Sequence, residues 1–224
     1  MMNNDNYVSK IYSYEERPKT AYPDQLITYL IERFDIKPNS KILDSGCGRG
    51  DFTYAFHNAG MVAIGIDGSS SDISEECQKI GGVDLEFDTL PFENDYFDVV
   101  FSKSVLEHIH KPEKYLNEIY RVLKPGGILI VLVPDWHSQM FIYYDDFSHV
   151  QPYTEKGVLD TLKIFGFSDV SAEIFYQLPS VWKYKWIKNV CKFLQFVGGP
   201  VKKISKNKFY RFARELMILG VGHK

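Results

Sequence analysis

Apolar runs alternate along this chain with segments whose apolar residues recur every three or four positions. The runs are predicted strands, and they fall at residues 41–44, 61–67, 83–88, 97–102, 128–134 and 170–178. Helical periodicity predicts helices at residues 23–34, 51–59, 72–80, 112–124 and 154–165. Several of the strands are apolar throughout, which is typical of parallel strands covered on both faces. Strands that alternate with helices in this way predict an open α/β sheet.

The first predicted strand ends in a loop rich in glycine. Asp44 is followed by Gly46, Gly48 and Gly50 at alternate positions, and a helix begins at Asp51. A strand, a tight glycine turn and a helix N-terminus let the backbone approach a ligand closely and direct free N–H groups at an anionic part of it. A dinucleotide fingerprint needs the spacing G-x-G-x-x-G. The spacing here is G-x-G-x-G, which disfavours a nicotinamide-dependent dehydrogenase.

Acidic residues also follow the next two predicted strands. Asp67 ends the second strand, 17 residues after Gly50. In a doubly wound sheet this position places a carboxylate at the tip of the neighbouring strand, where it can accept hydrogen bonds from both ribose hydroxyls. The alternative is an Asp that caps the next helix, although Ser69 already offers a cap. Asp88 ends the third strand, and its alternative role is that of a turn former before Pro91.

Four motifs in order resemble those of class I S-adenosylmethionine-dependent methyltransferases of the type 11 family. They are the acid and glycine loop at 44–50, the acid at 67, the Asp-Thr-Leu-Pro-Phe run at 88–92 and the Leu-Lys-Pro-Gly-Gly turn at 123–127. The resemblance implies a doubly wound, Rossmann-like sheet of seven strands, mostly parallel with an antiparallel last strand. Residues 216–222 suit that last strand, and the whole chain, residues 1–224, is expected to form one domain.

The resemblance also implies a cofactor, S-adenosyl-L-methionine, and the residues that hold it. Asp88 would bind the adenine amino group, with the backbone of Thr89 beside it, and Ser102 and Lys103 would begin the loop beneath the methionine part. The expected cofactor-binding residues are Asp44, Gly46, Gly48, Gly50, Asp67, Gly68, Asp88, Thr89, Ser102 and Lys103. Ser45 departs from the family pattern, in which valine or isoleucine is common.

A general base is needed only if the methyl acceptor is a hydroxyl whose proton must leave. His149 is the leading candidate, because it follows a polar and aromatic loop at 143–148, after the fifth strand. Acceptor pockets lie at this edge of doubly wound folds. The alternative is a structural histidine that holds the loop. His108 is expected to pack or hydrogen-bond beneath the cofactor, Glu107 and Asp146 are weaker polar candidates, and no metal site is predicted.

The charge is unevenly distributed along the chain. Residues 179–224 hold eleven Lys or Arg and one acid, whereas the net charge of the whole chain is −3.

If residues 216–222 form the last strand, residues 179–214 are an insertion between the last two strands. Within it, Trp182, Trp186, Val190, Phe193 and Val197 share one helical stripe, with lysines on other sides. Three readings stay open: a helix packed on the sheet with a solvated basic face, a helix that docks on anionic lipid, or a basic wall for an anionic acceptor such as a phosphate-linked sugar. Nucleic acid is disfavoured, because no RNA-binding motif accompanies the charge.

Cysteine content and the absence of targeting signals indicate the cellular compartment. The three cysteines form no C-x-x-C pair, so neither a disulfide framework nor a zinc site is predicted. We expect no signal peptide and no membrane span, so the predicted location is cytoplasmic, with peripheral contact at the inner membrane surface as an option. Residues 1–35 begin with a polar, tyrosine-rich segment that is either poorly ordered or a lid over the cofactor.

The predicted function is methyl transfer from S-adenosylmethionine to a small or lipid-linked acceptor. The loop at 144–154 looks like those of methyltransferases of bacterial-type cell-surface glycan synthesis, which favours a sugar hydroxyl. The alternatives are a quinone or lipid-ring methyltransferase and a catalytically silent cofactor-binding partner subunit. The oligomeric state is not predicted.

Overall fold

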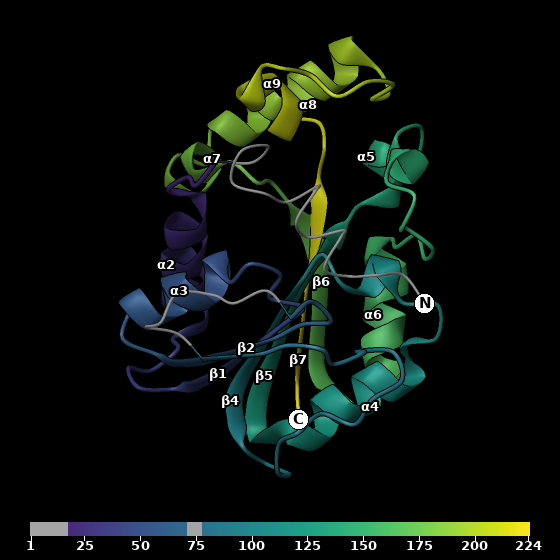
Figure 1. Ribbon diagram of the computed structural model, residues 1–224. Coiled ribbons are helices and arrows are strands. Elements are labelled where there is room, and N and C mark those ends of the chain that lie inside the picture. Colours follow the sequence, from purple (N-terminus) through teal and green to yellow (C-terminus); the bar gives the residue numbers. More distant parts are fainter. Residues whose placement is uncertain (1–17, 71–77) are drawn as a thin grey trace.

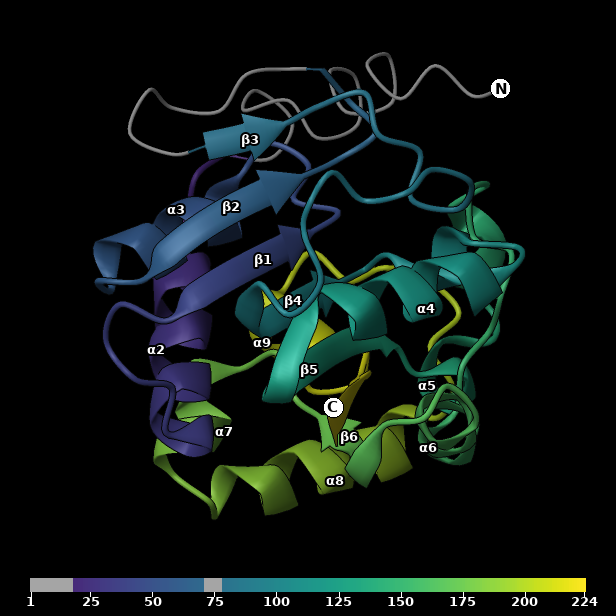
Figure 2. The same cartoon turned by 90° about the horizontal axis from the view of Figure 1, so that it is seen from below.

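A computed structural model describes residues 18–70 and 78–224 of the chain. Its centre is a seven-stranded sheet with strand order β3-β2-β1-β4-β5-β7-β6 (Figures 1 and 2). The strands are β1 (Lys41–Ser45), β2 (Val62–Ile66), β3 (Gln78–Ile80), β4 (Phe97–Lys103), β5 (Leu123–Pro134), β6 (Ser168–Phe175) and β7 (Met217–His223). Neighbouring strands from β3 to β5 are parallel, and β7 is antiparallel to both β5 and β6. The predicted fold class is therefore confirmed.

Helices cover both faces of the sheet. On one face lie α2 (Tyr22–Phe34), α3 (Asp51–Asn58) and α7 (Pro179–Lys183), and on the other lie α4 (Pro112–Val122) and α6 (Glu155–Ile164) (Figure 1). Each face has its own apolar cluster, because successive residues of a strand point to opposite sides. In β1, Ile42 packs with the α2 and α3 side chains, whereas Leu43 packs with those of α4. Thr154 caps α6, since its hydroxyl accepts a hydrogen bond from the Gly157 N–H at 3.1 Å.

The predicted third strand at 83–88 is wrong. β3 instead occupies Gln78–Ile80, where a helix was expected, and it pairs in parallel with β2; the rest of that expected helix lies outside the described residues. Residues 83–88 form turns because Asp84 accepts hydrogen bonds from the backbone N–H groups of Glu86, Phe87 and Asp88. Such side-chain and main-chain bonds compete with strand pairing. The alternation of Val83 and Leu85 nevertheless has a packing reason, because both contact the core on the α4 side.

The segment between β6 and β7 lies beyond the carboxyl ends of the parallel strands. Phe175 pairs with Met217, which pairs with Pro134, so the segment leaves and rejoins the sheet at the edge where β5 also ends. It contains α7, α8 (Ile187–Gly198) and α9 (Lys208–Phe212), which arch over that edge in Figure 1. The short helices α5 (Trp136–Gln139), η1 (Leu106–His108) and η2 (Tyr143–Asp145) complete the fold.

The expected helix over 182–197 is interrupted. Tyr184 is extended, which separates α7 from α8 and moves Trp182 off the predicted aromatic stripe. The Trp182 ring stacks on Tyr29 with 4.9 Å between centroids, and its Nε1–H donates to the Tyr176 carbonyl at 2.7 Å. Trp182 is therefore an anchor that joins α7 to α2, and the rest of the stripe begins at Trp186.

At the N-terminal side, α2 is a structural helix. Leu26, Ile27 and Leu30 are fully buried against the sheet. The possibility of a lid is thereby left to the residues before α2, and residues 1–17 of that segment lie outside the described residues. In the part of the chain that the structure describes, no helix has the length and apolar character needed to cross a membrane.

Candidate active site

The glycine loop after β1 is folded tightly against the end of β2. The N–H groups of Gly46 and Cys47 both donate to the Ile66 carbonyl, at 2.8 and 3.1 Å. Gly46, Gly48 and Gly50 have φ angles of +76°, +54° and +80°, which side chains rarely adopt. At Gly46, a Cβ would lie 2.3 Å from Val105 Cγ2, so this glycine lets the loop after β4 approach closely.

Asp44 lies beneath this loop and is shielded from water. Its side chain is 2% exposed and accepts a hydrogen bond from the Thr53 hydroxyl at 2.6 Å. Burial raises the pKa of Asp44 to about 7, although the bond from Thr53 opposes the shift. A positively charged group bound nearby would favour the ionised carboxylate, so Asp44 is suited to a cationic ligand.

Asp67 lies at the tip of β2, as predicted, and is tied to the glycine loop. Its two carboxylate oxygens accept from the N–H groups of Gly48 and Ser69, at 2.9 and 2.7 Å. Gly68 lies between the two bonded positions. Lys79, which the sequence analysis missed, donates to the Gly48 carbonyl at 2.7 Å and to the Ser69 hydroxyl at 3.0 Å. Its only sequence signal was a charged residue in the wrongly predicted helix.

Ser45, the departure from the family pattern, belongs to a buried polar cluster. Ser45 and Ser102 are paired across β1 and β4, and the Tyr115 hydroxyl of α4 lies 3.0 and 2.8 Å from their Oγ atoms. All three side chains are almost fully buried, and burial raises the pKa of Tyr115 to about 12. Ser102 therefore lies beneath the carboxyl edge of the sheet, and the next residue, Lys103, places its Nζ 5.5 Å from the Phe52 ring centroid.

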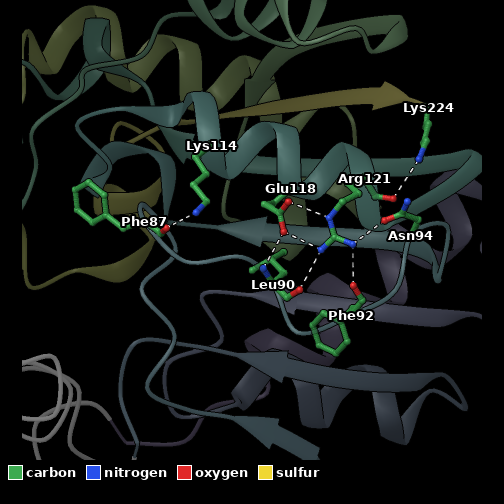
Figure 3. A network of polar contacts seen from close by, with 8 residues as sticks. All are labelled: Phe87, Leu90, Phe92, Asn94, Lys114, Glu118, Arg121 and Lys224. Carbon is green, nitrogen blue, oxygen red and sulfur yellow. Dashed lines mark hydrogen bonds and ion pairs between the residues drawn. The ribbon is translucent and has the colours of Figure 1, made fainter.

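The Asp88 and Thr89 segment is held from outside the sheet by α4 (Figure 3). Arg121 donates to the Leu90 and Phe92 carbonyls at 3.0 and 2.8 Å, and Glu118 accepts from the Leu90 N–H at 2.8 Å. The hydrogen bond with Arg121 lowers the pKa of Glu118. Asp88 and Thr89 are both exposed, so a ligand can reach them. The Asp88 carboxylate accepts from the Asp84 N–H at 2.8 Å, which fixes its orientation.

We expect Arg121→Ala to weaken cofactor binding without direct contact to the cofactor. Loss of the bonds to Leu90 and Phe92 should free the 88–92 segment and lower the free energy of unfolding by about 1–2 kcal/mol, because Arg121 is partly exposed. Calorimetric titration with S-adenosylhomocysteine should show a several-fold rise in Kd. Arg33→Ala removes an ion pair with Glu173 on the opposite face and is the matched control. Equal Kd values for the two variants would contradict this role.

Two histidines and a buried carboxyl group meet beside the loop after β5. The His149 Nδ1 lies 2.7 Å from the Tyr143 carbonyl, which can only accept, so Nδ1 carries the proton and Nε2 has the lone pair. His108 Nδ1 lies 3.2 Å from the Ser148 carbonyl and is oriented in the same way. The two rings are 4.9 Å apart between centroids. Both histidines are therefore held through Nδ1, which for His108 also lies 3.0 Å from the Ser148 hydroxyl, and the neutral His149 ring has Nε2 as its acceptor atom.

Glu107 has the most unusual environment in this cluster. Its side chain is fully buried, and neither carboxylate oxygen has a hydrogen-bond partner among the described residues. Burial raises the pKa of Glu107 to about 8. Burial also lowers the pKa of His108, and the neighbouring His149 adds a smaller shift in the same direction. Unpartnered buried carboxylates are rare and mark functional sites. This cluster can therefore hold or pass on a proton.

The same three residues have the composition of a metal site. One ligand atom from each of Glu107, His108 and His149 lies within 4.8 Å of the others, and both histidines have Nδ1 beside a backbone carbonyl. Two imidazoles and a carboxylate are a donor set that divalent metals use. The absence of a metal thus stays a prediction, which metal analysis of the purified protein tests.

Glu107 should make the stability of the protein depend on pH. Between about 4.5 and about 8 the folded protein retains a proton on Glu107 that the unfolded chain has released, so the free energy of unfolding falls as pH rises. One such group contributes up to about 1.4 kcal/mol per pH unit, and Asp44 acts in the same direction up to about pH 7. We expect Glu107→Gln to flatten this slope in urea unfolding from pH 5 to 9. An unchanged slope, equal to that of the exposed-site control Glu113→Gln, would disprove the protonated state.

Comparisons with known proteins agree with this geometry. A family model for a methyltransferase domain matches residues 43–131. An uncharacterised Methanocaldococcus jannaschii protein, MJ0638, is 31% identical over 187 residues, covering 81% of this chain and 80% of that protein. The ubiquinone/menaquinone biosynthesis C-methyltransferase of Vibrio parahaemolyticus is 32% identical over 116 residues, covering 46% of this chain and 45% of that enzyme.

Solved structures show the same fold. The phosphoethanolamine N-methyltransferase 2 of Haemonchus contortus, in complex with S-adenosyl-L-methionine, matches with a TM-score of 0.67 and 18% identity, covering 100% of this chain and 60% of that chain. The chain spans between 32% and 45% of the length of three curated relatives that it matches.

The strand order, with β7 antiparallel between β5 and β6, and the glycine loop after β1 agree with the Rossmann-like fold of the methyltransferase structures that the chain resembles. The chain belongs to the class I S-adenosylmethionine-dependent methyltransferases, as the methyltransferase-domain model over residues 43–131 indicates, and S-adenosylmethionine is the cofactor of this domain.

Proposed function

We propose that the enzyme transfers the methyl group to a hydroxyl of a cell-surface glycan precursor sugar. The observation that carries this proposal is the orientation of His149, whose Nδ1–H donates to Tyr143 and whose Nε2 is left as a proton acceptor beside Glu107. Transfer to nitrogen or carbon needs no such base when the acceptor is already nucleophilic. An aligned, unprotonated imidazole is of use to a hydroxyl acceptor.

The cofactor lies, in this proposal, along the carboxyl edge of β1, β2 and β4. Asp67 accepts from the ribose hydroxyls, Asp88 accepts from the adenine amino group, and Asp44 faces the positive methionine end. The glycines of the loop let the backbone approach the cofactor, and Gly68, Thr89, Ser102 and Lys103 line the same edge. Support comes from Asp44, Asp67 and Ser102, which lie at the carboxyl ends of β1, β2 and β4, and from the bond that joins Gly48 to Asp67.

The chemistry is an in-line displacement at the sulfonium methyl. The acceptor oxygen forms a bond to the methyl carbon while the carbon–sulfur bond breaks, and S-adenosylhomocysteine leaves as a neutral thioether. The hydroxyl proton passes to His149 Nε2. Positive charge on sulfur is removed in the transition state, so alignment and exclusion of water are the main tasks of the protein.

Assay with methyl-labelled cofactor tests the acceptor class. We expect label to enter lipid-linked or nucleotide-linked sugars in an alkali-stable ether. The second candidate is quinone ring methylation, which the similarity to the ubiquinone/menaquinone C-methyltransferase favours; label in a quinone and in no sugar would replace the first proposal. S-adenosylhomocysteine binding with no transfer to any acceptor would favour a silent partner subunit.

We also propose that α8 docks on an anionic membrane surface. The apolar face consists of Trp186, Val190, Phe193, Phe196 and Val197, which are between 37% and 87% exposed. Lys185, Lys188 and Lys192 flank this face, and five further cations follow between residues 202 and 211. A helix with exposed aromatic residues and lysines at its sides is suited to the interface of anionic lipid. The enzyme would then meet a lipid-linked acceptor at the inner membrane surface while remaining cytoplasmic.

Liposome sedimentation tests the docking of α8. We expect the protein to pellet with vesicles that contain anionic lipid, less so at high salt, and hardly at all with neutral vesicles. Phe193→Ser combined with Phe196→Ser should abolish pelleting, whereas Phe87→Ser, which changes an exposed phenylalanine outside the α7–α9 segment, is the control. Pelleting that changes neither with the salt concentration nor with the double substitution would contradict the proposal.

A further inference from the structure

Two adjoining cavities lie between α8 and the edge of the sheet. The first has a volume of about 410 Å³ and the second about 370 Å³. They share Glu155, Ile174, Gln195 and Leu216 as lining residues, so together they form one groove. It begins beside Asp135, directly after β5, and runs beneath α8. The groove therefore opens at the carboxyl edge of the sheet, to which the loop that bears His149 also belongs.

Arg214 is a buried cation in the wall of this groove. It is 9% exposed, and its Nη2 donates to the Gly198 and Gly199 carbonyls at 2.8 and 2.6 Å. Its Nε is buried against Gly198, where a Cβ would lie 2.8 Å away. Nη1 makes no hydrogen bond to a described residue and is not among the buried atoms, which leaves it as the donor that can face the cavity. A buried guanidinium without a carboxylate partner is suited to a phosphate.

Asp135 lies in the same cavity lining and has the opposite property. It is 2% exposed, and one carboxylate oxygen caps α5 by accepting from the Ser138 N–H at 2.8 Å. The other oxygen has no hydrogen-bond partner among the described residues and lies 3.8 Å from His137 Nδ1. A buried carboxylate oxygen of this kind requires a donor, and the hydroxyl of a sugar can supply one.

The second cavity is lined by two carboxylates and two lysines. Glu173 is paired with Arg33 and Glu155 accepts from the Ile174 N–H, whereas the two lysines have no carboxylate partner among the described residues.

The two lysines, Lys188 and Lys192, are one turn apart on α8 and both line this cavity. The Lys188 Nζ lies 5.9 Å from the Tyr176 ring centroid, and Tyr176 forms part of the same lining. Both lysines are exposed and lie at the margin of this cavity, whereas the exposed Phe193 and Phe196 of the same helix lie outside both cavities. One helix therefore offers lysines to the groove and aromatic side chains to the solvent.

We infer that this groove binds the phosphate-bearing part of a glycosyl phosphate, with Arg214, Lys188 and Lys192 on the phosphate and Asp135 on a sugar hydroxyl. The inference rests on the proposed function, because it assigns the groove to the acceptor. A phosphate ester is then the group by which the protein distinguishes its acceptors from free sugars. Lipid-linked and nucleotide-linked sugars share this chemistry, and the experiment separates them.

Calorimetry on the full chain saturated with S-adenosylhomocysteine tests the inference, with glucose 1-phosphate as the probe. We expect at least tenfold tighter binding than for methyl glucoside, and at least a tenfold loss when Lys188 and Lys192 are both changed to Gln. Lys185→Gln with Lys203→Gln removes the same charge outside both cavities and should change Kd less than twofold. Asp135→Asn should weaken glucose 1-phosphate and leave inorganic phosphate binding unchanged.

Equal losses in the two double variants would overturn the inference, since they would indicate a general charge effect. Equal binding of methyl glucoside, or no binding of any phosphate, would overturn it as well. Tighter binding of a short-chain prenyl diphosphate glucose than of UDP-glucose would assign a lipid-linked source, and the reverse order would assign a nucleotide-linked one. These binding measurements need no methyl transfer. The proposed phosphate site can therefore be disproved while methyl transfer to a sugar is confirmed, and the reverse outcome is equally distinguishable.

Discussion

His149→Ala is expected to lower kcat by about 100-fold or more, with little change in the Kd of S-adenosylhomocysteine. The loss corresponds to a general base that takes the acceptor proton in the transition state. His149→Ala removes the Nε2 acceptor, and it leaves Asp44, Asp67 and the glycine loop untouched. Stopped assays with methyl-labelled cofactor at saturation measure kcat, and calorimetric titration measures the Kd.

A matched control for this substitution is His57→Ala, because His57 is exposed on α3 and lies outside both the cluster of His108 and His149 and the groove beneath α8. It should retain a kcat near that of the wild type. A fall of less than about threefold in His149→Ala would assign this histidine to holding the loop through Tyr143. In that event the substitution should lower the thermal unfolding midpoint and leave kcat almost unchanged.

Gly46→Ala is expected to destabilise the fold by about 2–5 kcal/mol and to abolish measurable cofactor binding. Two costs combine: a φ of +76°, worth about 1–2 kcal/mol for a residue with a Cβ, and a contact at 2.3 Å with Val105, worth about 1–3 kcal/mol as overpacking. Relief of that contact would move the glycine loop away from the loop after β4. Chemical denaturation and calorimetric titration with S-adenosylhomocysteine measure the two effects separately.

Two further variants separate these costs. Gly60→Ala has a φ of +82° and no atom within 4 Å of the added Cβ, so it should show the backbone cost alone. Gly46→Ala combined with Val105→Ala removes the contact and should recover part of the stability, although the cavity left by Val105 limits the gain. If Gly46→Ala costs no more than Gly60→Ala, the close approach of the two loops is not the reason for this glycine.

The parallel half of the fold was predictable because its signals are local. Buried strands such as β4 are apolar throughout, and the glycine loop, Asp67 and the Leu-Lys-Pro-Gly-Gly turn follow one another at distances that the βαβ unit dictates. The strand at the edge was not predictable in this way. β3 has three residues with a lysine at its centre, and the better alternating run at 83–88 is turned by Asp84.

The candidate site was predictable residue by residue but not as a constellation. His149 and Glu107 were separate candidates, 42 positions apart in the sequence, and the N–H groups of Val150 and Gln151 bring them together by donating to the Glu107 carbonyl. No period or motif encodes such a bond between two loops. Likewise Lys79 and Arg214 gain their roles only from the backbone carbonyls that the fold places around them.

The two ends of the α7–α9 segment are held side by side, since Phe175 and Met217 are paired neighbours in the sheet. A hairpin turn could therefore replace the whole segment without moving any strand, and a foreign segment could be grafted at the same junction. A library of chimaeras at this junction would therefore vary the α8 wall of the proposed acceptor groove while conserving the glycine loop, Asp67 and the loop that bears His149.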